Sequence, residues 1–185
     1  MTSHATTGER TLDRRSMFKT VIIAVAAGAL VTSLIWNRGP RKGGMKQGTE
    51  APPFALAELR TGDTVSLADQ RGKPVLLVFW ATWCEPCKEE LPAIDALYRK
   101  VGDKAAVLTL VNEPPPAVLG YLRTAAERGT DLTFPVLLDG SGRIHVSYAA
   151  KNIPYSVLID RHGVVAASFV GAVDPGDLEE MLMGL

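Results

Sequence analysis

The chain has 185 residues, enough for one domain of ordinary size and an additional segment. Its formal net charge is zero, but residues 1–50 carry eight Lys/Arg and three Asp/Glu, a balance of +5, and residues 51–185 carry 12 and 17, a balance of −5. The acidic part contains no basic patch interleaved with aromatic residues. We therefore expect no nucleic-acid partner, and we expect the basic part to serve membrane targeting.

Residues 1–20 form a basic N-terminal segment, which contains the pair Arg14-Arg15 and precedes an apolar run at residues 21–36. A helix over this run spans roughly 24 Å, slightly less than the roughly 30 Å hydrocarbon core, and Trp36 is a suitable interfacial anchor. We predict an uncleaved, single-pass transmembrane signal anchor at 21–36 in the cell membrane, with the rest of the chain outside the cytoplasm, in the periplasm or at the outer face. A cleaved signal peptide and twin-arginine export stay open as alternatives.

The polar, Gly-rich residues 37–50 predict a flexible linker, and the composition changes at Ala51, where we expect a domain over residues 51–185. The elements expected in this domain are, in chain order, short strands at 54–56 and 65–67, a buried strand at 75–80, a helix from Cys84 to about Tyr98, a buried strand at 105–111, a helix at about 117–128, a strand at 135–139, a short helix at 144–148, a hairpin of 156–160 and 164–170, and a C-terminal helix capped by Asp174. This order predicts an α/β fold with a mixed sheet covered on both faces.

The two cysteines of the chain lie in one segment, Trp83-Cys84-Glu85-Pro86-Cys87, between the buried strand and the start of a helix. A thiol attacks a disulfide only as the thiolate, and a helix N-terminus stabilises that charge. We therefore predict a thiol-disulfide oxidoreductase whose Cys84–Cys87 disulfide is redox-active and needs no other cofactor. Cys84 is expected to be the exposed nucleophile, and Cys87, one turn further on, the more buried resolving thiol.

Two other interpretations of the cysteine pair are weaker. A disulfide over so short a spacing closes too small a loop to stabilise a fold much. A zinc site needs two further ligands, and the three histidines, His4, His145 and His162, do not pair at ligand spacing. We therefore predict no metal site.

Residues 80–88, which run from Trp80 to Lys88, resemble the active-site segment of the thioredoxin superfamily. The Glu85-Pro86 pair between the cysteines is similar to that of its membrane-anchored TlpA/ResA-type branch, extracytoplasmic thiol reductases linked to cytochrome c maturation. Further matches to the family are Pro92 and the segments 134–139 and 153–160. The resemblance covers about residues 51–185 and implies a thioredoxin-like mixed sheet flanked by helices.

The resemblance also implies partners and substrate-binding residues. Its clients would be protein thiols and disulfides, such as those of apocytochrome c, and its electron donor a membrane thiol-transfer protein. Pro154 would be a cis-proline that faces the disulfide, and Ile153 would offer its backbone to the substrate as a strand does. From the residues themselves, we expect Trp83 to present an apolar docking surface and Glu85 and Pro86 to lie against the substrate. The negative charge of Glu85 beside the thiolate is expected to raise the pKa of Cys84.

The chain departs from cytoplasmic thioredoxins at one position. Those proteins bury an aspartate six residues before the first cysteine, where this chain has Val78. Glu113 is our candidate for the general base that serves Cys87, because it follows the strand 105–111 at the strand edge where the cysteine pair is expected. A solvated loop acid is the alternative interpretation of Glu113.

Three other functions compete with a reductase. A peroxiredoxin carries Thr three residues and Pro seven residues before its reactive cysteine, where this chain has Ala81 and Leu77, so we discount a peroxidase. A copper-delivery protein of the same fold needs Cys-x-x-x-Cys spacing and a nearby histidine. A disulfide-forming oxidase shares every residue named above, and only Glu85 and Pro86 weakly favour the reductase.

Overall fold

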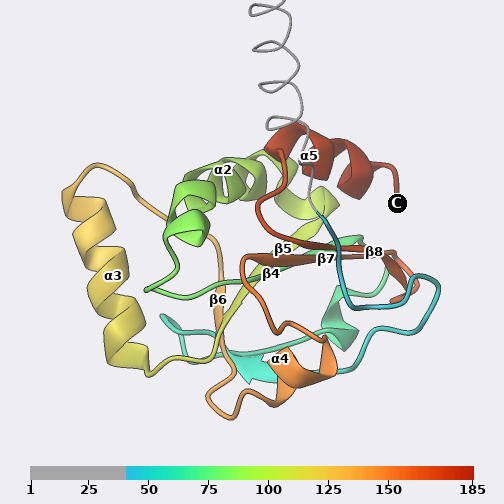
Figure 1. Cartoon of the computed structure of the whole chain (residues 1–185), viewed down its shortest axis with the longest axis horizontal. Coiled ribbons are helices and arrows are strands. Elements are labelled where there is room, and N and C mark those ends of the chain that lie inside the picture. Colours follow the sequence, from blue (N-terminus) through green and yellow to red (C-terminus); the bar gives the residue numbers. More distant parts are fainter. Residues whose placement is uncertain (1–40) are drawn as a thin grey trace, which may run out of the picture. The chain divides into compact units, whose positions relative to one another are not determined.

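The computed structural model of the protein describes residues 41–185 (Figure 1). The predicted basic segment at 1–20, the predicted signal anchor at 21–36 and the first part of the predicted linker lie outside the described residues. None of the helices found within 41–185 has both the length and the apolar character needed to cross a membrane.

Within residues 41–185, six strands form the central sheet, which is mixed, as predicted. In order across the sheet they are β1 (Arg41–Lys42), β8 (Val165–Val170), β7 (Tyr155–Ile159), β4 (Val75–Phe79), β5 (Ala106–Val111) and β6 (Val136–Leu138). The neighbours β4, β5 and β6 run parallel, whereas β7 runs antiparallel to both β4 and β8. The strand that leads to the cysteine pair, β4, is therefore central in the sheet.

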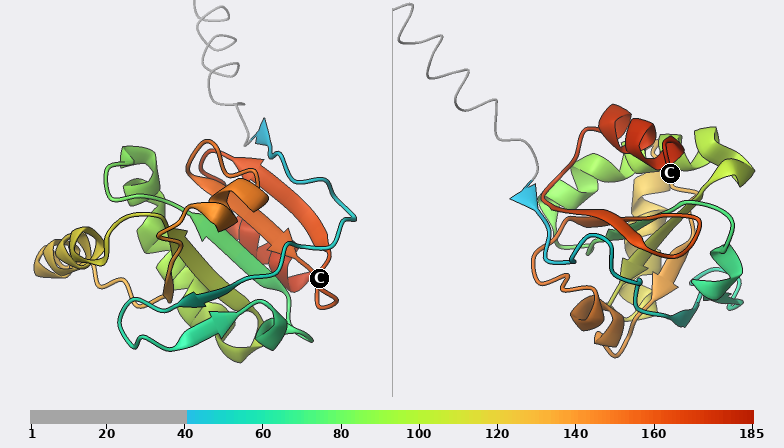
Figure 2. Two further views of the ribbon diagram at one scale, coloured as in Figure 1. Left: turned by 90° about the horizontal axis from the view of Figure 1, so that it is seen from below. Right: turned by 90° about the vertical axis from the view of Figure 1, so that its right-hand side faces the viewer.

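Helices cover both faces of this sheet. Figure 1 shows α2 and α5 above it, α4 below it and α3 beside the end that carries β6, and Figure 2 shows the β2–β3 ribbon on the same side as α4. The remaining elements are β2 (Ala55–Ala57), β3 (Thr64–Ser66), α2 (Glu85–Val101), α3 (Pro115–Glu127), α4 (Arg143–Ser147), α5 (Pro175–Met183) and the short 3₁₀ helices at Ala68–Gln70 and Gly102–Lys104. This arrangement is a thioredoxin-like α/β fold.

The unbroken apolar sequence of β4 is explained by its two buried faces. Successive side chains of a strand point to opposite faces. Leu76 and Val78 accordingly join the core cluster under α2 and α5, whereas Leu77 and Phe79 join the cluster on the side of α4. All five residues of β4 are at most 2% exposed. The strand therefore gives the active-site loop that follows it a rigid base.

Two helix starts depend on particular residues. The Asp174 side chain accepts hydrogen bonds from Gly176 N and Asp177 N, which confirms the predicted cap of α5. Helix α3 begins at Pro115, two residues earlier than expected from the Pro-rich sequence. Proline is tolerated in the first turn because its missing N–H has no helical partner there.

The second half of the predicted linker differs from a free tether. Residues 41–50 run along β8: Arg41 pairs with Val170, Gly43 N donates to Ser168 O at 2.6 Å, and Glu50 forms a bridge with Val164. A Cβ on Gly43 would lie 2.5 Å from Ser168 Oγ. Glycine, which suggests flexibility in the sequence, here permits a close approach of two backbones. Residues 41–50 therefore pack with the sheet and belong to the same compact unit as residues 51–185.

Candidate active site

The cysteine pair lies at the N-terminus of α2, immediately beyond the end of β4. Cys84 is the N-cap residue of the helix, and its Sγ accepts a hydrogen bond from Cys87 N at 3.3 Å. The two residues form a disulfide with a Cα–Cα distance of 5.3 Å. Pro86 lies in the first turn, where it needs no hydrogen-bond partner for its nitrogen. The strand, loop and helix are therefore arranged as the sequence predicts.

Exposure distinguishes the residues of this segment from one another. Cys84 is 5% exposed and Cys87 is 1% exposed, so Cys84 is the more accessible cysteine, but both are buried in this disulfide form. The expectation of an exposed Cys84 holds only in this relative sense, because both cysteines belong to the core cluster under α2. Trp83 is 70% exposed, whereas Trp80 is buried at 1%. A client that approaches the disulfide would therefore meet the Trp83 indole.

Glu85 lies at the exposed start of α2, but its charge is paired. Lys88 Nζ donates to Glu85 Oε1 at 2.7 Å, and the Glu85 side chain is 77% exposed against 27% for Lys88. Any effect of the Glu85 charge on Cys84 is therefore accompanied by that of a cation one turn along the helix. The pair presents both signs of charge beside the disulfide.

Glu113 contacts the loop that precedes Cys84. Its Oε2 accepts from Thr82 N and its Oε1 accepts from the Thr82 hydroxyl, both at 2.7 Å. Thr82 and Glu113 are both half-buried. The alternative of a freely solvated loop acid is therefore wrong, because both carboxylate oxygens hold the turn that positions the first cysteine.

The segment before β7 approaches the same region. The Ile153–Pro154 peptide bond is cis, as the resemblance implies, and Pro154 O accepts from Gly171 N at 2.8 Å. Ile153 packs against the core cluster that contains both cysteines. Within residues 41–185 no hydrogen bond is made by the N–H or C=O of Ile153. These two groups are therefore available to an extended peptide.

Glu90 is a residue of the site that sequence reasoning missed. A glutamate in the middle of a helix is typical of an exposed position, yet Glu90 is 7% exposed and its Oε1 accepts from Val173 N at 3.2 Å. Burial raises the pKa of Glu90, and the Val173 hydrogen bond opposes that shift in part. Glu90 follows Cys87 by three positions and precedes the buried Ile94 by four, so the helical period placed it on the inner face.

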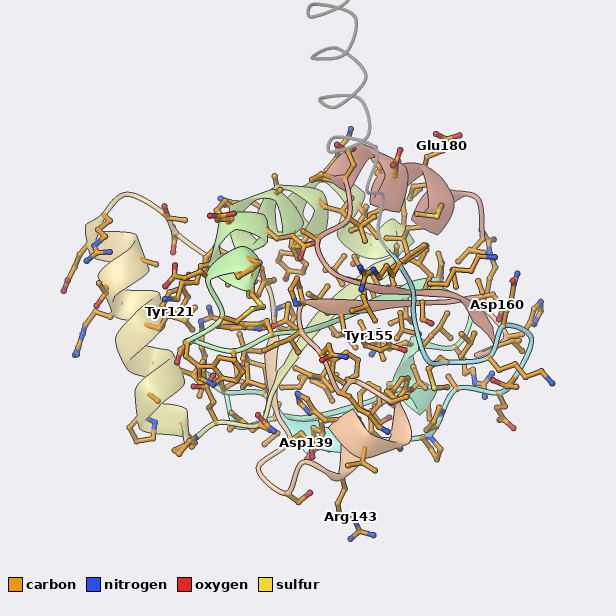
Figure 3. The ribbon with its side chains drawn as sticks, in the orientation of Figure 1. Tyr121, Asp139, Arg143, Tyr155, Asp160 and Glu180 are labelled. Carbon is orange, nitrogen blue, oxygen red and sulfur yellow. A yellow bond between two sulfur atoms is a disulfide. The ribbon has the colours of Figure 1, made fainter. Side chains whose placement is uncertain are left out.

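Tyr121 was also missed. Figure 3 shows it on α3, on the side turned toward α2. Its ring centroid lies 5.6 Å from that of Trp80, and Lys88 Nζ lies 5.9 Å from the Tyr121 centroid. Desolvation raises the pKa of Tyr121, with Lys88 opposing the shift and Glu85 adding to it. Tyr121 thus links α3 to the first turn of α2.

Other polar groups at this edge of the sheet serve local structure. In the part of the chain from residue 41 onward, no three His, Cys, Asp or Glu side chains gather so that they could hold a metal ion. His145, a buried residue of α4, has its Nδ1 2.8 Å from Oδ2 of the buried Asp139. This contact fixes the loop after β6.

Comparison with known proteins places this geometry in a family. The family model described as the AhpC/TSA family matches residues 47–168. The chain belongs to this thioredoxin-like family. Thioredoxin-like protein YneN of Bacillus subtilis (strain 168) is 35% identical to this AhpC/TSA-family chain over 164 residues, which cover 84% of this chain and 95% of YneN.

Two further similarities are informative. Thiol-disulfide oxidoreductase ResA of Bacillus cereus (strain ATCC 10987 / NRS 248) is 34% identical over 170 residues, which cover 91% of this chain and 95% of ResA. The crystal structure of the exposed lipoprotein thioredoxin Etrx1 from Streptococcus pneumoniae strain TIGR4 superposes with a TM-score of 0.63 and 30% identity, covering 72% of this chain and all of that chain. This AhpC/TSA-family chain is accordingly a thiol-disulfide oxidoreductase, and it contains a Cys84–Cys87 disulfide.

Proposed function

We propose that this chain is an extracytoplasmic, membrane-tethered enzyme that reduces disulfides in exported proteins, apocytochrome c among them. The observation that carries the proposal is the Cys84–Cys87 disulfide at the N-terminus of α2, beside the Trp83 indole that is 70% exposed. Protein thiols and disulfides are its substrates. Its own cysteine pair is the redox group, and no other cofactor takes part.

The dithiol form reacts first through Cys84. Its Sγ attacks one sulfur of a substrate disulfide as the thiolate. The substrate S–S bond breaks, a mixed disulfide forms, and the other substrate sulfur leaves as a thiolate that takes up a proton. Cys84 is suited to this step because the Cys87 N–H points at its sulfur and the positive end of the α2 dipole stabilises the thiolate.

Cys87 completes the cycle. Its thiol loses a proton and attacks Cys84 Sγ, which releases the second substrate thiolate and restores the disulfide. Two electrons have then passed to the substrate, and a membrane thiol-transfer protein returns them. The proposed proton acceptor is Glu113, whose carboxylate oxygens retain lone pairs beyond those that Thr82 uses. Glu113→Gln should change the thiol titration of Cys87, and an unchanged titration would eliminate this role.

Substrate binding is proposed for the residues around the disulfide. Trp83 provides an exposed apolar contact, and Glu85 and Pro86 form the exposed first turn of α2. Ile153 offers an N–H and a C=O to an extended client, and Pro154 shapes that segment. Strand-like pairing suits many clients because it depends on the backbone rather than on one side chain.

Membrane attachment is proposed to depend on the apolar residues 21–36. Similarity to Etrx1, which is described as an exposed lipoprotein, supports a location outside the cytoplasm. Extraction of cell membranes with alkali and protease treatment of intact cells test this assignment. Release by alkali would contradict a transmembrane anchor, and the mass of the mature protein separates the anchor from a cleaved signal peptide.

The direction of electron transfer is tested by the equilibrium reduction potential of the full chain in a mild detergent. A value near or below about −250 mV is expected, because thioredoxin-like reductants lie in that range. A value above about −150 mV approaches the strong oxidants and would make the chain a disulfide-forming oxidase.

The cysteine roles are tested separately from the direction. Cys87→Ser should accumulate a mixed disulfide between Cys84 and a client, because the resolving thiol is missing. Cys84→Ser is the matched control and should trap none. Accumulation in the Cys84→Ser variant instead would reverse the assignment of nucleophile and resolving thiol.

A further inference from the structure

A continuous set of contacts connects helix α3 to the charges beside the disulfide. It begins at the buried Trp80, passes to the half-buried Tyr121 ring at 5.6 Å, and continues to Lys88 Nζ, which lies 5.9 Å from the centroid of that ring. It ends at Glu85 Oε1, 2.7 Å from Lys88 Nζ. Glu85 directly follows Cys84, so this set of contacts ends at the residue next to the first cysteine of the disulfide.

The Lys88 ammonium is more confined than a surface lysine. Its side chain is 27% exposed, whereas that of its carboxylate partner Glu85 is 77% exposed. A cation within about 6 Å of an aromatic centroid is attracted to the ring face. The Lys88 ammonium is therefore confined by the Tyr121 ring as well as by Glu85, because an exposed i,i+3 ion pair is weak in water.

The position of this cation matters for the thiolate. Glu85 follows Cys84 directly, and a carboxylate there disfavours a second negative charge on the sulfur. An ammonium held against Glu85 offsets that effect, whereas an ammonium that moves freely in water is screened. The charge next to Cys84 thus depends on a residue that lies 37 positions further along the chain, on another helix.

We propose that Tyr121 is a positioning residue that holds Lys88 Nζ against the Glu85 carboxylate and thereby favours the thiolate of Cys84. Tyr121 touches neither the sulfur atoms nor a client in this assignment, and it acts only through Lys88. Helix α3 is then part of the electrostatic environment of the disulfide, in addition to covering the core. The inference rests on the proposed role of Cys84 as the attacking thiol.

The test measures the pKa of Cys84 in the reduced full chain in detergent, from the pH dependence of its alkylation by iodoacetamide, assigned by peptide mass. Tyr121→Leu removes the ring but keeps apolar volume, and it should raise the pKa of Cys84 by roughly 0.2 to 0.7 unit, the range expected for loss of one exposed charge contact. The reduction potential should become more negative. Tyr121→Phe keeps the ring and should leave both values at those of the unmodified chain.

A double-mutant cycle with Lys88→Met separates this role from simple packing against Trp80. Lys88→Met should raise the pKa of Cys84 by at least as much as Tyr121→Leu, and adding Tyr121→Leu to it should change nothing further. The proposal is overturned if Tyr121→Leu leaves the pKa unchanged, or if its effect persists in the Lys88→Met background. Neither measurement uses a client, so an oxidising potential of the unmodified chain would contradict the reductase proposal while leaving this test intact.

Discussion

The contact between Glu113 and Thr82 should make a measurable contribution to the stability of the oxidised domain. The perturbation is Glu113→Ala, which deletes both acceptors of the bonds at 2.7 Å to Thr82 N and the Thr82 hydroxyl. Hydrogen bonds to a charged group contribute about 1.5–3 kcal/mol each. Both residues are half-buried, so water replaces part of the loss, and we expect the free energy of unfolding to fall by about 2 kcal/mol.

Thr82→Val removes only one of the two hydrogen bonds, because it deletes the hydroxyl and keeps the backbone N–H that donates to Glu113. It should cost about 1 kcal/mol. In the double variant the two effects should not add, since the hydroxyl bond is already absent from Glu113→Ala. The exposed Glu89 on α2 provides the control, and Glu89→Ala should change stability by less than about 0.5 kcal/mol.

The assay is urea denaturation of a soluble form that retains residues 41–185, monitored by tryptophan fluorescence, which changes when the buried Trp80 becomes exposed, whereas Trp83 is already exposed in the folded form. A total stability of about 5–15 kcal/mol makes a loss of 2 kcal/mol readily visible in the urea midpoint. If Glu113→Ala behaved like Glu89→Ala, the two contacts would contribute nothing, and the view that Glu113 holds the turn before Cys84 would be refuted.

Three other substitutions have definite expected outcomes. Asp95→Ala removes the buried Oδ1 that accepts from Thr133 N at 2.5 Å and from Phe134 N at 3.0 Å. Two N–H groups then lose their partner, so the free energy of unfolding measured in urea should fall by about 3 kcal/mol. Burial raises the pKa of Glu90 in the folded state above its value in the unfolded state, so the free energy of unfolding should decrease as the pH rises from the unfolded-state pKa to the folded-state pKa. Glu90→Gln should remove this decrease from the plot of stability against pH. A plot that keeps its slope in the variant would contradict the assignment. Gly43→Val should displace residues 41–48 from β8, which faster hydrogen exchange of their amides would report, because its Cβ would lie 2.5 Å from Ser168 Oγ.

Features encoded by neighbouring residues were predictable from the sequence. The strand at 75–80, the hairpin and the Asp174 cap each depend on a local pattern of apolar residues or on one capping side chain, and each was found within one or two residues of its expected place. The disulfide belongs to this group, because the spacing of Cys84 and Cys87 on one helical turn is itself local.

Features that depend on contacts between distant segments were not predictable in the same way. Strand topology placed Glu113 at the correct edge of the sheet, but its partner Thr82 lies 31 residues away and no sequence pattern connects them. The link from Tyr121 to Lys88 is of the same kind. Glu90 is different, since the period of α2 placed it inside and only its polar character suggested a solvated face.

The pairing of residues 41–50 with β8 has a practical consequence for any shortened form of the chain. A form that starts at Ala51, the boundary suggested by composition, would lack β1 and leave the outer edge of β8 with unpaired N–H and C=O groups. An open strand edge is a template on which a second molecule can add its own strand, which leads to dimers and aggregates. Such a form would lose solubility for reasons unrelated to its cysteines, and a potential measured on it would mix association with redox chemistry. Expression boundaries should therefore fall before Arg41.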